Sequence, residues 1–369
     1  MNPVFSNPKE ENGGRTYRFT LSGLNVSLAN ALRRVVLSDI PINVIKTETY
    51  NDNQCKIIQN TSRIHNEIVK QRLSCIPIHL KELDLLPGKY QLEVDVSNDT
   101  ENILYVTTED FRIRNKLNGN YLTADETGKI FPPCSSTLSY IDFLRLRPKI
   151  SDTIPGEKIN LVADFSVSTA RQNSSFNVVS KCSYGNTPDM VKINEELDKL
   201  EAKLKTEEKT EDEIRFIKKN FMLLDAERIY VADSFDFVVE TIGIYTNHEI
   251  MSLASEILYQ KFEDMVRDID SNIIQIVNSE TTIDFCFDLL IENEDYTVGK
   301  VIEYILYEKY YLGDKTLSFC GFKKFHPHDN GATVRLAFSQ MGDKTLAKQY
   351  VRNSCIEAQN IYKKIKKFF

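Results

Sequence analysis

An internal repeat is the feature that most constrains how this chain of 369 residues can fold. Residues 15–24 alternate apolar and polar side chains, as a half-buried strand does, and residues 281–291 repeat this alternation. A short polar turn and an amphipathic helical pattern follow each strand, at 27–37 and at 297–306. Two copies of one unit predict an α+β fold in which antiparallel sheets and helices pair as a pseudo-dimer. The alternative is that strand and helix patterns recur by chance.

The two helical patterns also match in detail. Asn25 and Asp295 stand at equivalent positions before the helices, and both are residue types that cap free backbone N–H groups. A longer amphipathic helix is predicted to close each unit, over residues 249–269 and 345–368. The predicted pseudo-dimer interface consists of six apolar side chains on the two shorter helices: Leu28, Leu32, Val35, Val298, Ile302 and Ile305.

Two adjacent arginines interrupt the apolar pattern of the first helix. Neighbouring side chains on a helix point about 100° apart, so Arg33 and Arg34 cannot share one narrow polar stripe. We expect them, with Asn30, to lie on the flank that faces away from the interface. For a helix of this pattern, a solvated or locally paired arginine is the favoured interpretation. The alternative is a contact with a partner, which the planar fork of a guanidinium suits because it binds carboxylates or backbone carbonyls.

Composition argues against several classes of protein. The formal net charge is −7, so the chain as a whole does not attract DNA or RNA, and any such contact would be local. We expect neither a signal peptide nor a membrane span, because no cationic start with an apolar core and no run of about 18 apolar residues is present. Seven cysteines without a C-x-x-C pair predict neither a disulfide framework nor a zinc site, and favour a reducing cytosol or nucleus.

The region between the two copies divides into further segments. Residues 50–162 mix short apolar runs with turn signals, as an inserted, mainly β module does. Residues 192–220 are highly charged, with Leu197, Leu200 and Leu204 on one apolar edge. This segment predicts a solvated helix or helical hairpin, and a partner-binding coiled coil is the alternative.

No motif indicates catalysis. The sequence GDKTL occurs at 313–317 and 342–346, but an aspartate separates Gly from Lys-Thr, so both copies are expected to be turns rather than phosphate loops. His326, His328 and Asp329 lack a second ligand cluster nearby in sequence, which favours a polar loop over a metal site. The lysines at 363–367 suit a helix C-terminus, and phosphate binding by them is the less favoured interpretation.

The first copy resembles a known family. The sequence LANALRRV at 28–35, followed by Ile40-Pro41, is similar to the alpha-motif of RNA polymerase assembly subunits: bacterial alpha, archaeal D and the third-largest eukaryotic subunit. The resemblance continues in the inserted domain through Asn60-Thr61-Ser62, His65-Asn66-Glu67, Arg72-Leu73 and Ile76-Pro77-Ile78, and then in the strand and helix of residues 235–266.

The second copy resembles the small partner subunit of that family, archaeal L or the eleventh eukaryotic subunit. The similarity lies in the sequence NEDYTVG at 293–299, in Gly321-Phe322-Lys323 and in His326-Pro327. Both families in one chain resemble the fused arrangement of some large cytoplasmic DNA viruses. The implied domains are a D-like dimerisation unit, an inserted domain and an L-like dimerisation unit. Their ranges are, in that order, 1–49 with 163–270, which carries a charged helical insertion at 190–222; 50–162; and 271–369.

The resemblance implies a non-catalytic platform that nucleates assembly of a DNA-directed RNA polymerase. The expected partners are the largest and second-largest subunits and small polymerase subunits, with Asn30, Arg33 and Arg34 facing the second-largest. DNA and RNA would be met only through the complex, and neither a membrane nor a homo-oligomer is required. Relatives hold zinc or iron–sulfur groups, but the scattered Cys55, Cys75 and Cys134 predict no cofactor. The expected location is the host cytoplasm and virion for a viral chain, and otherwise the nucleus. A freestanding nucleic-acid-binding protein is the alternative.

Overall fold

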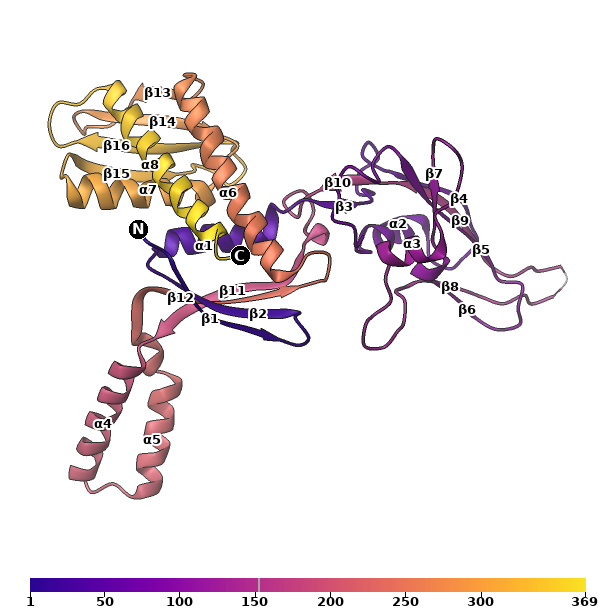
Figure 1. Cartoon of the computed structure of the whole chain (residues 1–369), viewed down its shortest axis with the longest axis horizontal. Helices are drawn as coiled ribbons and strands as arrows, with labels where there is room; N and C mark the ends of the chain where they lie inside the picture. Colours follow the sequence, from indigo (N-terminus) through magenta and orange to yellow (C-terminus); the bar gives the residue numbers. More distant parts are fainter. Residues whose placement is uncertain (152) are drawn as a thin grey trace. The chain divides into compact units, whose positions relative to one another are not determined.

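The structure, a computed structural model, describes residues 1–151 and 153–369 and contains two compact units (Figure 1). The first unit comprises residues 1–36, 181–240 and 247–369, and the second comprises residues 37–180 and 241–246. Within the first unit we distinguish a first half, up to residue 270, from a second half, residues 271–369. Helices and antiparallel sheets occur in both units, so the predicted α+β class is confirmed.

The first half contains an antiparallel sheet with the strand order β1-β2-β12-β11. Helix α1 follows β2, and helix α6 follows β12. Phe19 on β2 lies opposite Phe237 on β12, and their stacked rings have centroids 5.2 Å apart. The strands are β1 (Val4–Glu11), β2 (Thr16–Ser22), β11 (Val179–Pro188) and β12 (Tyr230–Thr241), and the helices are α1 (Val26–Ser38) and α6 (Asn247–Asp270).

The second half has a sheet with the order β13-β14-β16-β15. Helix α7, continued by a π-helical turn over Tyr307–Gly313, follows β14, and helix α8 follows β16. The two halves therefore place four strands and two helices in the same sequential and spatial order, which confirms the internal repeat at the level of topology. The elements are β13 (Gln275–Asn278), β14 (Cys286–Glu292), α7 (Tyr296–Leu306), β15 (Leu317–Lys323), β16 (Gly331–Phe338) and α8 (Lys344–Lys366).

The strand expected over residues 281–291 begins later than predicted. Phe285 has a φ of 51°, in the left-handed region that a strand does not use, so β14 starts only at Cys286. The predicted alternation is also wrong for Asp288, which is buried because Arg335, directly opposite on β16, binds both of its carboxylate oxygens at 2.7 Å. A bidentate ion pair thus allows an acidic residue in a buried position.

The two long helices α6 and α8 pack side by side and close their respective sheets (Figure 1). Both confirm the helices predicted over 249–269 and 345–368. Their buried residues recur three or four positions apart, as in a helix that buries one stripe. Phe262 and Tyr362 meet across the pair, with stacked ring centroids 5.9 Å apart.

The charged segment forms a helical hairpin, one of the predicted alternatives. Helices α4 (Met190–Thr206) and α5 (Glu211–Leu223) connect β11 to β12, and a short 3₁₀ turn over Ala226–Arg228 follows them (Figure 1). The side chains of Asp189 and Thr210 accept backbone N–H groups at the two helix starts. The two helices contact each other, and Leu204 on α4 is buried.

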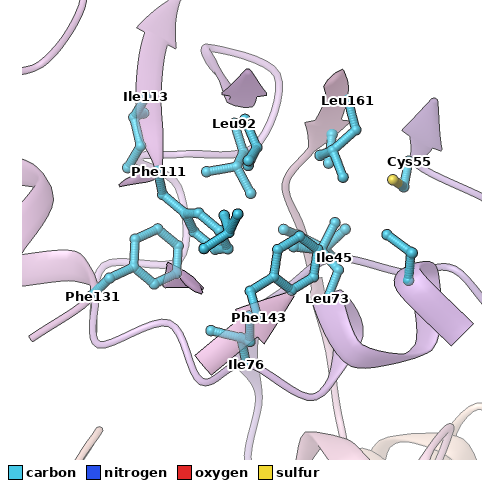
Figure 2. Close-up of a cluster of buried hydrophobic side chains, with 14 of the residues drawn as sticks. Ile45, Cys55, Leu73, Ile76, Leu92, Phe111, Ile113, Phe131, Phe143 and Leu161 are labelled. Atoms are coloured by element: carbon cyan, nitrogen blue, oxygen red, sulfur yellow. The ribbon is translucent and has the colours of Figure 1, made fainter. Parts of the chain in front are cut away.

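The second unit surrounds its own hydrophobic core. One sheet has the order β4-β9-β5-β7, and β6 pairs with β8. Figure 2 shows part of the core, where Phe111 makes edge-to-face contacts with Phe131 and Phe143. The elements are β4 (Cys55–Asn60), α2 (Asn66–Ser74), β5 (Tyr90–Ser97), β6 (Leu104–Thr107), β7 (Arg112–Asn115), α3 (Ala124–Ile130), β8 (Asp142–Leu146) and β9 (Lys158–Asp164), with 3₁₀ turns at Thr108–Asp110 and Ser174–Phe176.

This unit extends beyond the range 50–162 at both ends. Strand β3 (Ile42–Val44) pairs with β10 (Ser166–Ser168) and joins the segments that enter and leave the mainly β region. Tyr245 donates a hydrogen bond to the carbonyl of Pro41 at 3.1 Å, which brings residues 241–246 into the same unit.

Candidate assembly interface

Helix α1 is capped and buried as its sequence predicts. The side chain of Asn25 accepts the backbone N–H of Ser27 at 2.9 Å, which satisfies one free donor at the helix start. Its apolar stripe is completely buried and consists of Leu28, Ala29, Ala31, Leu32, Val35 and Val36. The polar residues Asn30, Arg33 and Arg34 of α1 are left partly accessible.

Arg34 does not point away from the second half, and that expectation is wrong. Its guanidinium donates to the hydroxyl of Thr297 at 2.7 Å and to the carboxylate of Asp295 at 3.0 Å. Asp295 simultaneously accepts the backbone N–H of Thr297 at 2.7 Å and so caps α7. Arg34 of the first half thus holds the N-terminus of the equivalent helix in the second half, because a capping carboxylate still has a lone pair to offer.

Arg33 and Asn30 lie together on the other side of this flank. The guanidinium of Arg33 donates to the amide oxygen of Asn30 at 3.0 Å, and both side chains are partly exposed. Burial raises the pKa of the Cys182 thiol on β11 to about 12, against the opposing effect of the nearby Arg33 charge. Arg33 is therefore held beside the first sheet while part of its surface stays accessible.

All six side chains of the predicted pseudo-dimer interface are buried: Leu28, Leu32, Val35, Val298, Ile302 and Ile305. A tyrosine that the sequence analysis missed lies among the same helices. Tyr362 on α8 is completely buried and donates its hydroxyl to the carbonyl of Leu28 at 3.2 Å. Burial raises the pKa of this phenol, so it remains a neutral donor. Its position within the buried stripe of α8 is the signal that could have identified it.

Ion pairs border the contact between the two halves. Arg352 on α8 binds both carboxylate oxygens of Asp270 on α6, at 2.7 and 2.9 Å. Lys366 reaches Glu256 at 2.8 Å. Farther along, Lys261 and Glu294 lie 3.1 Å apart, and both side chains are mostly shielded from solvent. The halves thus contact one another through an apolar helix layer with a charged rim.

Residue types that could carry other chemistry are dispersed or engaged. Within residues 1–151 and 153–369, no three His, Cys, Asp or Glu side chains are grouped as metal ligands would be. The described helices include none with both the length and the apolarity needed to cross a membrane. His326 and His328 lie in an exposed loop, where His326 Nδ1 accepts a backbone N–H from His328, as a polar loop predicts.

The two GDKTL copies and the C-terminal lysines form local structural contacts. Asp343 caps α8 by accepting the N–H of Leu346 at 2.7 Å, and the first copy leads into β15. The first copy is thus a bend that precedes β15, as predicted, whereas the prediction is wrong for most of the second copy, because Lys344, Thr345 and Leu346 form the first turn of α8 behind the Asp343 cap. Lys364 binds Asn2 at 2.8 Å, so part of the lysine cluster is engaged within the first unit.

Comparison with known proteins identifies relatives of most of the chain. The family model described as the RNA polymerase Rpb3/Rpb11 dimerisation domain matches residues 18–262. DNA-directed RNA polymerase subunit Rpo3 of Archaeoglobus fulgidus is 25% identical over 67% of this chain and 91% of its own length. Subunit RPAC1 of human DNA-directed RNA polymerases I and III is 25% identical over 47% of this chain.

A protein of Tetrahymena thermophila named conjugation stage-specific protein is 33% identical over 26% of this chain. The chain spans about a third of the length of the Tetrahymena protein and about half of human RPAC1.

Proposed function

The chain belongs to the RNA polymerase Rpb3/Rpb11 dimerisation domain family, and on that basis we propose that it is a non-catalytic assembly platform of a DNA-directed RNA polymerase. Its function is to nucleate binding of the largest and second-largest catalytic subunits, together with small subunits, for transcription. The observation that carries the proposal is the shared helix layer, in which two halves of one topology meet through α6 and α8. A platform of this kind needs no active site of its own.

The proposal includes a fusion of two subunit types. The D-like unit comprises 1–49 and 163–270, the inserted domain 50–162, and the L-like unit 271–369. The family match ends at residue 262, so the assignment of the last part is supported by its repeated topology rather than by relatives. Fusion would keep the halves of this intramolecular pseudo-dimer at an effective concentration on the order of millimolar, provided that the linker is short.

The proposed fusion resembles the fused subunits of some large cytoplasmic DNA viruses. If the chain is viral, its proposed location is therefore the host cytoplasm and the virion. A cellular chain would work in the nucleus. The platform holds no metal or other cofactor in this proposal.

The proposed contact with the second-largest subunit is the accessible part of α1. Asn30 and Arg33 support this role best because their side chains are hydrogen-bonded to one another and lie partly exposed. Arg34 contributes less directly, since its guanidinium is already engaged with Asp295 and Thr297. The proposed contact therefore depends mainly on Asn30 and Arg33, and less on Arg34.

Affinity purification of the tagged full chain from its native source tests the proposal. The largest and second-largest polymerase subunits should co-purify with the wild-type chain. Arg33→Ala should reduce recovery of the second-largest subunit about tenfold or more, because a charged hydrogen-bonding side chain contributes roughly 1.5–3 kcal/mol. Arg215→Ala, an equally charged change on the exposed face of α5, should bind as wild type. Recovery of no polymerase subunit, with salt-dependent DNA binding by the isolated chain, would favour the freestanding nucleic-acid-binding protein instead.

A further inference from the structure

A hollow lined by arginines lies on the second unit. Its residues are distant in sequence from helix α1, which carries the proposed contact with the second-largest subunit. Four arginines of the described chain line it, with a cavity volume of about 510 Å³. This volume falls in the range of ligand clefts, roughly 300–1,000 Å³. We call it the arginine hollow, and it is lined by Arg63, Arg72, Arg145 and Arg147, with Asp142 and Glu157 among its other residues.

The arginine hollow has an excess of positive charge. Its four guanidinium groups face two carboxylates. The Glu157 carboxylate is buried and is neutralised by Arg147, whose Nε lies 2.5 Å from it. Arg72 donates to the backbone carbonyl of Asp142 at 2.9 Å and therefore keeps its charge without a carboxylate partner in that bond. The chain is acidic overall, so this is a local exception to its field.

Two guanidinium groups are available for a ligand. Arg63 and Arg145 are exposed, and neither forms an ion pair with any residue of the ranges 1–151 and 153–369. Arg63 also borders a second, shallower depression beside the start of α2, with a volume of about 580 Å³. The depression is also lined by Glu67, so Arg63 is the one arginine or lysine that these residues contribute at the border of the two hollows.

An exposed aromatic ring adjoins these charges. Tyr105 on β6 lies directly opposite Arg145 on β8, and the guanidinium carbon is 4.9 Å from the ring centroid. Tyr105 is 50% exposed, and Ile103, which lines the hollow itself, is 56% exposed. A flat ring beside arginines is the combination that stacks unpaired bases while binding phosphates.

We propose that the arginine hollow binds single-stranded nucleic acid, with phosphates on Arg63 and Arg145 and a base against Tyr105. An acidic peptide would use the same guanidinium forks but would gain little from the exposed ring, so the observations favour a nucleic acid. DNA and RNA share this chemistry, and both are tested below. The proposal does not rest on the assembly function, and it departs from the expectation that nucleic acid is met only through the complex.

Fluorescence anisotropy of the purified full chain with labelled oligo(U) and oligo(dT) of roughly 20 nucleotides measures this binding. Arg63→Gln with Arg145→Gln should weaken binding about tenfold near 0.1 M salt and should lower the slope of log K against log salt by about 1.4. Lys56→Gln with Arg112→Gln removes the same charge from exposed positions of β4 and β7 in the same unit, and should bind as wild type. Tyr105→Ala should weaken binding, whereas Tyr105→Phe should retain it.

Several results would overturn the proposal. They are no binding by the wild-type chain, an equal loss in both double variants, or competition by polyglutamate as effective as by unlabelled oligo(U). The last would show that the hollow takes carboxylate peptides. An unchanged melting temperature of the Arg63 and Arg145 variant establishes that folding is intact. Arg33→Ala, which tests the assembly function, should bind both oligonucleotides normally, so failure of one proposal is distinguishable from failure of the other.

Discussion

The two halves of the first unit have the same strand order but very different connections. In the second half, α7 leads through one π-helical turn into β15, and residues 324–330 join β15 to β16. In the first half, most of the second compact unit lies in the chain between α1 and β11, and the hairpin α4–α5 joins β11 to β12. The comparison teaches that the sheet and its two helices are common to both halves, whereas the connections between these elements accommodate additional structure. The functional proposals follow this division: assembly by the common part, and nucleic-acid binding by an addition.

The largest expected effect concerns the helix layer that the halves share. Phe262→Ala should lower the free energy of unfolding by about 3–5 kcal/mol, because it opens a cavity at a completely buried aromatic contact with Tyr362. Urea denaturation should still show the two halves unfolding together. Phe216→Ala, at an exposed site on α5, should cost less than about 0.5 kcal/mol. Separate transitions of the two halves in the wild-type chain would contradict the common layer.

An intermediate effect is expected at the polar link between the halves. Asp295→Ala removes the cap of α7 and should cost about 0.5–2 kcal/mol. Arg34→Ala should cost about 0.5–1 kcal/mol, since the arginine side chain is 39% exposed and solvent screens the pair. A double-mutant cycle from urea denaturation measures their coupling. Strictly additive losses would mean that Arg34 does not stabilise the cap.

Exchange of a connection should have a smaller effect. Replacing residues 189–229 with a short Gly/Ser loop would give the first sheet a connection like that of the second. We expect the chain to fold with a change below about 1 kcal/mol, because the cost of loop closure changes slowly with length. Circular dichroism and the melting temperature report the outcome. Loss of the folded first unit would show that the hairpin is part of the common core rather than an addition.

The smallest expected effect is a pH dependence of the charged rim. Arg352 lowers the pKa of Asp270, and Lys366 lowers that of Glu256, in each case chiefly through a side-chain hydrogen bond. Folded pKa values below those of the unfolded chain stabilise the fold above about pH 4, and this contribution disappears as the pH falls through the folded values.

Asp270→Asn with Glu256→Gln should therefore reduce the loss of stability between about pH 7 and pH 3, measured as the urea midpoint. Glu101→Gln, an exposed change in the second unit, is the matched control. If the urea midpoint of the variant falls with pH as steeply as that of the wild-type chain, these ion pairs do not stabilise the interface.

The sequence by itself determined the elements of this protein and their repetition. Alternation and three-four spacing depend on local backbone geometry, so β2, α1, α6, α7 and α8 were predicted near their observed ends. The caps Asn25 and Asp295 were found for the same reason, since a cap acts within two or three residues.

Only the tertiary structure decided which polar groups meet. Arg34 and Asp295 are 261 positions apart, and helical periodicity specifies the face of a side chain without its partner. The arginine hollow likewise combines residues from positions 63 to 157, which a motif search treats as unrelated. Phe285 shows the limit of the sequence pattern, because its left-handed backbone delays the start of β14, whereas the residue types alone predict a strand from residue 281. Local structure depends on neighbouring residues, whereas an interface depends on how distant segments pack.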